Sequence, residues 1–257
     1  MIKNIQEIYS GKHKLKNIPE NSVAIIASAI RTERWMETYE FLKRTNETPF
    51  IMIFSGHIRP EYKLPDNFYY VYSTMNAAGC CEVCLRLAHC IPEVKYIINI
   101  ADDCLWPEKL LDTLVAAHES DPLEDVMIAP AFWGDVNAKE TGELTNTYHA
   151  HDPDSPTLCV AGMAKKTTSI KIGGCDRAMR LHELGGNVRS IGDLPVREIE
   201  PWNNSHILGP TCYSYDRPLL DWLWTTNRVG GDVSFYRLDP LQPYEAEDLQ
   251  GEVWINE

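Results

Sequence analysis

The stretch KYIINIADDCLWPEKLLDTLV (residues 95–115) decides how the chain is interpreted. Its first six residues, Lys95–Ile100, are a short apolar run rich in isoleucine, which predicts a buried strand. Two carboxylates, Asp102 and Asp103, follow this strand, and Pro107 suits the first position of a helix. Strand, acidic turn and helix in this order predict an α/β unit with both carboxylates at the carboxyl end of a strand.

The sequence on either side of this unit repeats the alternation of apolar runs and amphipathic segments. Helices are predicted from Thr32, where Trp35, Tyr39 and Leu42 recur at helical spacing, and from Asn76 up to Pro92. Four further strands are predicted, at Ser22–Ala29, Pro49–Phe54, Phe68–Ser73 and Asp125–Pro130. We therefore expect an α/β fold, with a mixed and mostly parallel sheet flanked by helices in one large domain.

Composition limits the classes of function. The chain has 257 residues, of which 44% are apolar, and its formal charge is −13. This argues against a nucleic-acid partner, because binding several phosphates requires clustered Lys and Arg. No run approaches the roughly 20 apolar residues that span a bilayer, and no apolar signal core follows Met1, so we expect a soluble, cytoplasmic protein without a membrane span.

The acidic pair is the strongest candidate for chemistry. In open α/β sheets, ligands bind outside the carboxyl ends of the strands, where Asp102 and Asp103 are expected. Carboxylate oxygens suit Mg²⁺ or Mn²⁺, and such an ion neutralises charge on a departing diphosphate. The alternative is an ordinary turn, because Asp is common after strands.

The order of these segments resembles the GT-A glycosyltransferases, particularly those of family 2. The resemblance covers residues 22–130, and its motifs are NAAGCCEVCLRLA (residues 76–88) followed by the acidic turn and the Pro-led helix. It implies transfer of a sugar, with inversion, from a nucleoside diphosphate sugar to the hydroxyl of an acceptor such as a glycan, with Mn²⁺ or Mg²⁺. It also implies that residues 1–130 form the nucleotide-sugar-binding half and residues 131–257 the acceptor-binding half.

The resemblance also implies roles for single residues. Asp103 matches the direct metal ligand, and Asp102 is then expected near the ribose or the metal's waters. Ala101 stands where the family has its first acidic residue, a departure that puts metal dependence in doubt. The nucleotide-binding positions of the family map onto Ala27, Ser28, Ala29, Arg31, Ser55, His57 and Asn76. Arg31 is a candidate to pair with phosphate, and a solvated arginine at a helix start is the alternative.

Inverting transfer needs a general base, which the family supplies from its second half. We rank Asp248 and Glu247 ahead of Asp193 for this role, although a surface position is the alternative for each. His149 and His151 are candidates to complete the metal shell, and a polar surface loop is again the alternative. Beyond Pro130 the periodicity weakens, so secondary structure there is poorly predicted.

Other interpretations stay open. Cys81 and Cys84 have zinc-ligand spacing, but they lie on one predicted helix, which favours small core residues over a metal site. A nucleotidyltransferase would also use carboxylates and metal, yet IASAIRTER (residues 26–34) lacks the expected glycines. A degenerate transferase fold that serves as a binding module is the non-enzyme alternative.

Overall fold

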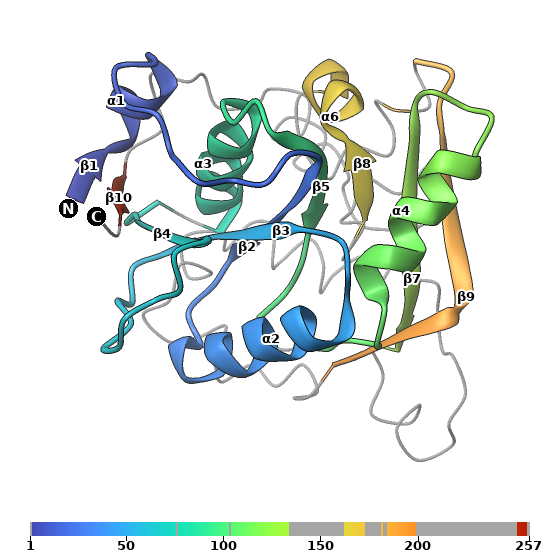
Figure 1. The fold of residues 1–257 in the computed structure, drawn as a ribbon, viewed down its shortest axis with the longest axis horizontal. Coiled ribbons are helices and arrows are strands. Elements are labelled where there is room, and N and C mark those ends of the chain that lie inside the picture. Colours follow the sequence, from blue (N-terminus) through green and yellow to red (C-terminus); the bar gives the residue numbers. More distant parts are fainter. Residues whose placement is uncertain are drawn as a thin grey trace, which may run out of the picture.

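The computed structural model describes residues 2–75, 77–102, 104–133, 162–172, 181, 184–198 and 251–255 (Figure 1). Within these residues one sheet of ten strands has the order β1-β10-β4-β3-β2-β5-β8-β7-β9-β6. The strands are β1 (Ile2–Asn4), β2 (Ser22–Ser28), β3 (Phe50–Gly56), β4 (Phe68–Tyr72), β5 (Val94–Asn99), β6 (Cys104–Leu105), β7 (Val126–Trp133), β8 (Met163–Lys165), β9 (Asn187–Glu198) and β10 (Glu252–Trp254). The helices are α1 (Ile5–Tyr9), α2 (Thr32–Thr45), α3 (Ala77–His89), α4 (Leu110–Ser120) and α6 (Lys166–Ile172).

The expected fold class is confirmed: the chain forms a mixed α/β sheet in a single domain. Strands β4, β3, β2 and β5 are parallel neighbours, and β7 is parallel to β9. These parallel ladders are the longer ones, whereas each antiparallel ladder joins only two or three residue pairs. Every strand and helix predicted before residue 100 is present close to its predicted bounds.

Helices cover both faces of the sheet because the strands are apolar on both sides. Val23 and Ile25 of β2 belong to the core beneath α2 and α4, whereas Ala24 and Ile26 belong to the core beneath α1 and α3. Burial on both faces is typical of parallel strands, which appear in sequence as continuous apolar runs. Among the helices in the described ranges, none is long and apolar enough to cross a membrane.

Two element bounds differ from the sequence prediction. Helix α4 begins at Leu110 rather than at Pro107, because Lys109 adopts a left-handed conformation (φ 58°) and its N–H donates to the carbonyl of Thr45 (3.2 Å). Strand β7 continues beyond Pro130 to Trp133. The ladder with β9 shifts register directly after Pro130. Regular pairing is interrupted at such a bulge, so a proline, which has no N–H to donate, is tolerated there.

The last described strand, β10, lies at the same edge of the sheet as the first strand, β1. Strand β10 lies between β1 and β4 and is antiparallel to both, so the two ends of the chain are neighbours (Figure 1). The carbonyl of Gly251 accepts a hydrogen bond from the N–H of Ile5 (2.9 Å). A Cβ on Gly251 would lie 2.7 Å from the side chain of Val71, so glycine allows this close approach.

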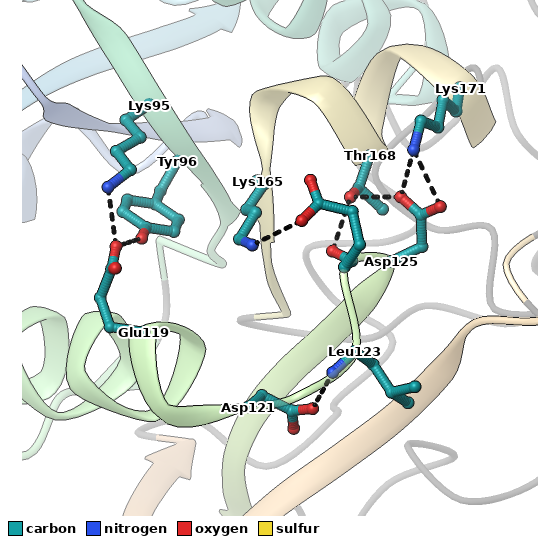
Figure 2. Close-up of polar contacts among 10 residues, drawn as sticks. Lys95, Tyr96, Glu119, Asp121, Leu123, Asp125, Lys165, Thr168 and Lys171 are labelled. Atoms are coloured by element: carbon teal, nitrogen blue, oxygen red, sulfur yellow. Dashed lines mark hydrogen bonds and ion pairs between the residues drawn. The ribbon is translucent and has the colours of Figure 1, made fainter.

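A charged network lies at the amino ends of β5 and β7 (Figure 2). Glu119 of α4 accepts hydrogen bonds from Lys95 (2.7 Å) and from the hydroxyl of Tyr96. Asp125 accepts from Lys171 of α6 (2.9 Å). These contacts hold the ends of α4 and α6 to the sheet, on the edge opposite the carboxyl ends of the same strands.

Candidate functional site

The candidate site lies where the carboxyl ends of four parallel strands meet. The order β4-β3-β2-β5 means that the chain leaves β2 toward β3 on one side and returns through α3 to β5 on the other. The connection therefore reverses direction between β2 and β5, which makes this a topological switch point. Ligands of open α/β sheets bind outside the carboxyl ends of the strands at such a point.

Polar side chains replace apolar ones at this edge. Ser28 ends β2, Ser55 lies beside it in β3, and Asn99 ends β5, and all three are buried. Strand alternation places them on the face that α3 covers, because Ile26, Ile53 and Ile97, two residues earlier in each strand, belong to that core. The hydroxyl of Ser55 has no hydrogen-bond partner within the described residues, which is unusual for a buried polar atom.

The turn after β3 packs tightly against the end of β2. The N–H of Ala29 donates to the carbonyl of Ser55 (2.8 Å), and a Cβ on Gly56 would lie 2.3 Å from the carbonyl oxygen of Ala29. Only glycine fits this approach. The hydroxyl of Tyr70 lies within hydrogen-bond distance of the carbonyl oxygens of Gly56 (2.7 Å) and Ile58 (2.8 Å). This fixes the segment that carries His57.

Asp102 connects the end of β5 to the turn after β2. Its Oδ2 accepts hydrogen bonds from the backbone N–H groups of Ile30 (2.6 Å) and Arg31 (2.7 Å), and its Oδ1 pairs with Nη1 of Arg31 (2.6 Å). The side chains of Arg31 and Asp102 are only 10% and 2% exposed. A buried ion pair of this kind needs good geometry and additional hydrogen bonds to offset its desolvation, and Asp102 has both.

The structure brings several of the expected nucleotide-binding residues to this one edge. Ser28, Ala29, Ser55 and His57 follow or end neighbouring strands, and Arg31 precedes the first turn of α2. Ala27 also lies at the end of β2, but its side chain packs into the core beneath α2, and its carbonyl contacts the thiol of Cys84 (3.6 Å).

The remaining candidates lie mostly outside the described residues. Asp193 belongs to β9, and its side chain is not among those described. Asn76, Asp103, His149, His151, Glu247 and Asp248 fall outside the described ranges. The general base and the proposed metal ligands therefore stay predictions from the sequence.

The cysteines of α3 belong mainly to the protein interior. Cys84 is part of the core between α3 and the sheet, and Cys80 packs against Ile30. Burial raises the pKa of the Cys84 thiol, which favours the neutral form over the thiolate that binds metal.

Sequence reasoning missed Asn99 as a member of the site. It is a polar residue in the otherwise apolar run KYIINI, and it lies beside Ile26 of β2. An amide in the last position of a buried strand is itself a signal, since such a group needs polar partners.

The described residues do not form a metal site on their own. Among them, no group of three His, Cys, Asp or Glu side chains lies close enough to hold an ion. Asp102 fits a structural role better than a ligand role, because both of its oxygens are engaged with Arg31 and backbone N–H groups.

Comparison with protein-family profiles and with curated proteins found no match. Among solved structures, the chain is similar to a crystal structure of GalNAc-T7 with UDP, GalNAc and Mn²⁺. The TM-score is 0.46 at 12% sequence identity, and the match covers 88% of this chain. The chain spans only 55% of the length of that protein, and no residue role is transferred from it.

Proposed function

We propose that this protein is a GT-A-type glycosyltransferase that moves a sugar from a nucleoside diphosphate sugar to a hydroxyl acceptor. The observation that carries the proposal is the contact of Asp102 with Ile30 and Arg31, which holds the acidic turn beside the end of β2 at the switch point. The sequence order of residues 76–115, which resembles family 2, supports the choice of donor.

The roles of the residues follow from their place at this edge. Ser28, Ser55 and His57 are proposed to contact the nucleotide, because they lie in the last two positions of the adjacent strands β2 and β3 or directly after β3. Asp103 is proposed to hold Mn²⁺ or Mg²⁺, with His149 or His151 completing its ligands. A bound divalent ion would neutralise charge on the diphosphate as it leaves.

The acceptor and the general base are assigned to the second half of the chain. Asp248 and Glu247 remain the first candidates to take the proton of the acceptor hydroxyl, with Asp193 third. An acceptor half formed by residues 131–257 is also part of the proposal. Strands β8 and β9 of this half join the same sheet as the proposed nucleotide edge, which supports a shared site.

A panel of nucleoside diphosphates and nucleoside diphosphate sugars tests the proposal by thermal shift, with and without Mn²⁺. We expect one nucleotide to raise the melting temperature and Mn²⁺ to increase the rise. Asp103→Asn should remove the Mn²⁺-dependent part. Glu108→Gln is the matched control, because Glu108 is an exposed carboxylate of the same segment, and it should respond like the parent. Absence of any shift across the panel would contradict the proposal.

A binding module without transferase activity is a second candidate. It is favoured by the engagement of both Asp102 oxygens within the protein, together with Ala101, which leaves Asp103 alone in the motif. The same panel separates the two functions when free nucleoside diphosphate is also measured. A donor that binds and is never turned over, across sugar acceptors and water, would support the binding module.

A further inference from the structure

We infer that Asp102 is a positioning residue that pins the turn after β2, and that Arg31 is its internal counter-ion rather than a phosphate ligand. From the resemblance, Asp102 is expected near the ribose or the metal's waters, and Arg31 is either a phosphate ligand or a solvated arginine at a helix start. The part of this inference that concerns donor binding depends on the proposed function. We call the contacts of Asp102 with Ile30 and Arg31 the clamp. The part of the inference that concerns the clamp does not depend on the proposed function.

The first argument is the way helix α2 begins. Arg31 is the N-cap residue of α2, and its own side chain makes no capping hydrogen bond. Asp102 holds the approach to the helix from a different loop, because its Oδ2 accepts hydrogen bonds from the N–H groups of Ile30 and Arg31, the two residues that lead into α2. A carboxylate at this place also interacts favourably with the positive end of the helix. Asp102 thus fixes the backbone at the start of α2, although it lies 71 positions from Arg31.

The second argument is charge and burial. The guanidinium of Arg31 is 10% exposed, and its Nη1 lies 2.6 Å from Oδ1 of Asp102. The two opposite charges cancel in an environment that excludes water, so the pair presents little net charge to an incoming phosphate. Removing either partner alone leaves a buried, unpaired charge, which is strongly destabilising.

The third argument is location. Asp102 follows β5 and its partners follow β2, and these are the two strands on either side of the switch point. The N–H of Ile100 also donates to the carbonyl of Ile26 (2.8 Å), so the two strand ends are joined by main chain and side chain together. The contacts of Asp102 therefore fix the backbone that leads directly into Asp103, and they leave Asp103 as the one carboxylate of the pair proposed to hold metal.

A double-mutant cycle on the nucleotide-free protein tests the clamp. Arg31→Met and Asp102→Asn should each lower the melting temperature by roughly 6–12 °C, and the double variant should lose far less than the sum. Arg31→Lys, which keeps the charge, should recover part of the loss. The matched control is the more exposed pair Lys171–Asp125, where Lys171→Met and Asp125→Asn should each shift it by about 2 °C or less. Additive or negligible losses at Arg31 and Asp102 would overturn the clamp.

Hydrogen exchange on the parent protein gives a second test that needs no variant. The amides of Ile30 and Arg31 lie outside the strand ladders, yet both should exchange at rates close to those of the buried amides of β2. Exchange as fast as that of exposed turns would contradict the hydrogen bonds to Asp102.

Nucleotide binding separates a positioning role from a ligand role. Binding of UDP, GDP or ADP, whichever stabilises the parent, is measured by calorimetry with and without Mn²⁺ on Asp102→Asn at a temperature where it is folded. We expect a severalfold weaker affinity that still improves with Mn²⁺, whereas Asp103→Asn should lose the Mn²⁺ effect. Loss of the Mn²⁺ effect in Asp102→Asn would overturn the positioning role. If the parent binds none of the three, the proposed function fails, while the cycle and the exchange data still decide the clamp.

Discussion

The side chain of Asn46 links the last turn of α2 to the N–H of Leu111 in the first turn of α4. Its Nδ2 donates to the carbonyl of Leu42 in the last turn of α2 (2.9 Å), and its Oδ1 accepts from the N–H of Leu111 in the first turn of α4 (2.7 Å). Asn46 therefore supplies an acceptor for an N–H in the first turn of α4 that α4 itself cannot satisfy, and it adds a second donor to the carbonyl of Leu42, which also accepts from the backbone N–H of Asn46 (3.1 Å). The two helices cover the same face of the sheet, so this residue joins neighbouring parts of one layer.

Replacement of Asn46 tests this double cap. Asn46→Ala should lower the free energy of unfolding by about 1–2 kcal/mol, because it leaves the N–H of Leu111 without its partner and removes the side-chain hydrogen bond to the carbonyl of Leu42. Asn46→Asp retains the acceptor for Leu111 and should lose less. Denaturant unfolding measures both changes. Equal stability of the alanine variant and the parent would show that water replaces the cap.

The hydrogen bonds that Asp112 accepts should make a contribution to stability that is lost in acid. Burial alone raises the pKa of this carboxyl, but hydrogen bonds from Thr48 and Glu47 outweigh it and lower the pKa below 3.8. A lowered pKa means that the stabilisation is fully present above about pH 4 and is lost as the pH falls through the folded value. Asp112→Asn should therefore be less stable than the parent at pH 7, and the difference should shrink toward pH 3. A difference that does not change with pH would contradict this assignment.

The burial of His89 should make the stability of the protein depend on pH in a second range, above that of Asp112. Burial, with the charges of Arg86 and Lys166, lowers the pKa of His89 from 6.5 to about 4. The unfolded chain then takes up a proton that the folded protein refuses, so stability falls as the pH decreases from about 6.5 toward 4. The loss is at most about 3 kcal/mol.

A neutral replacement isolates the contribution of His89. Its Nε2 lies 3.0 Å from the hydroxyl of Ser169 in α6, and His89→Gln offers a neutral side chain in its place. The free energy of unfolding of this variant, relative to that of the parent, should rise as the pH falls from 7 to 4. Parallel pH profiles for parent and variant would place the pKa of His89 near its ordinary value.

Gly56 predicts a steric limit at the candidate site. Gly56→Ala places a Cβ 2.3 Å from the carbonyl oxygen of Ala29, and backbone on both sides must move to relieve the clash. We expect a loss of about 2 kcal/mol or more in the free energy of unfolding. Gly11→Ala is the matched control, because Gly11 has φ +70° and open space around it, so only its backbone strain of about 1 kcal/mol remains. A Gly56 variant no less stable than the Gly11 variant would contradict the close approach.

The first half of the fold is predictable from sequence because its strands are buried on both faces. Apolar runs such as residues 22–29 and 49–54 can be identified as strands without knowing which strands they pair with. Helix α2 is identified by the helical spacing of Trp35, Tyr39 and Leu42. The order of these elements also predicts that Ser28, Ser55 and Asp102 meet at one edge. This follows because the carboxyl ends of parallel strands all lie at the same edge of a sheet.

The parts that escaped prediction depend on contacts between distant residues. The start of α4 is set by Asn46 and Thr45 of the preceding helix, not by Pro107. The orientation of Asp102 depends on Arg31, and no local pattern shows whether a carboxylate after a strand faces solvent, metal or arginine. Strand β10 has only three residues and no periodicity to reveal it.

The position of β10 has a consequence for how the protein is made. Within the described sheet, Ile2–Asn4 pair only with Glu252–Trp254, so β1 has no strand partner until Glu252–Trp254 have been translated. The central strands can assemble during synthesis, while β1 and the outer edge of β4 wait. Ribosome-bound chains that stop before residue 250 should thus leave the outer edge of β4 accessible to chaperones, whereas chains in which β10 has formed should have that edge paired.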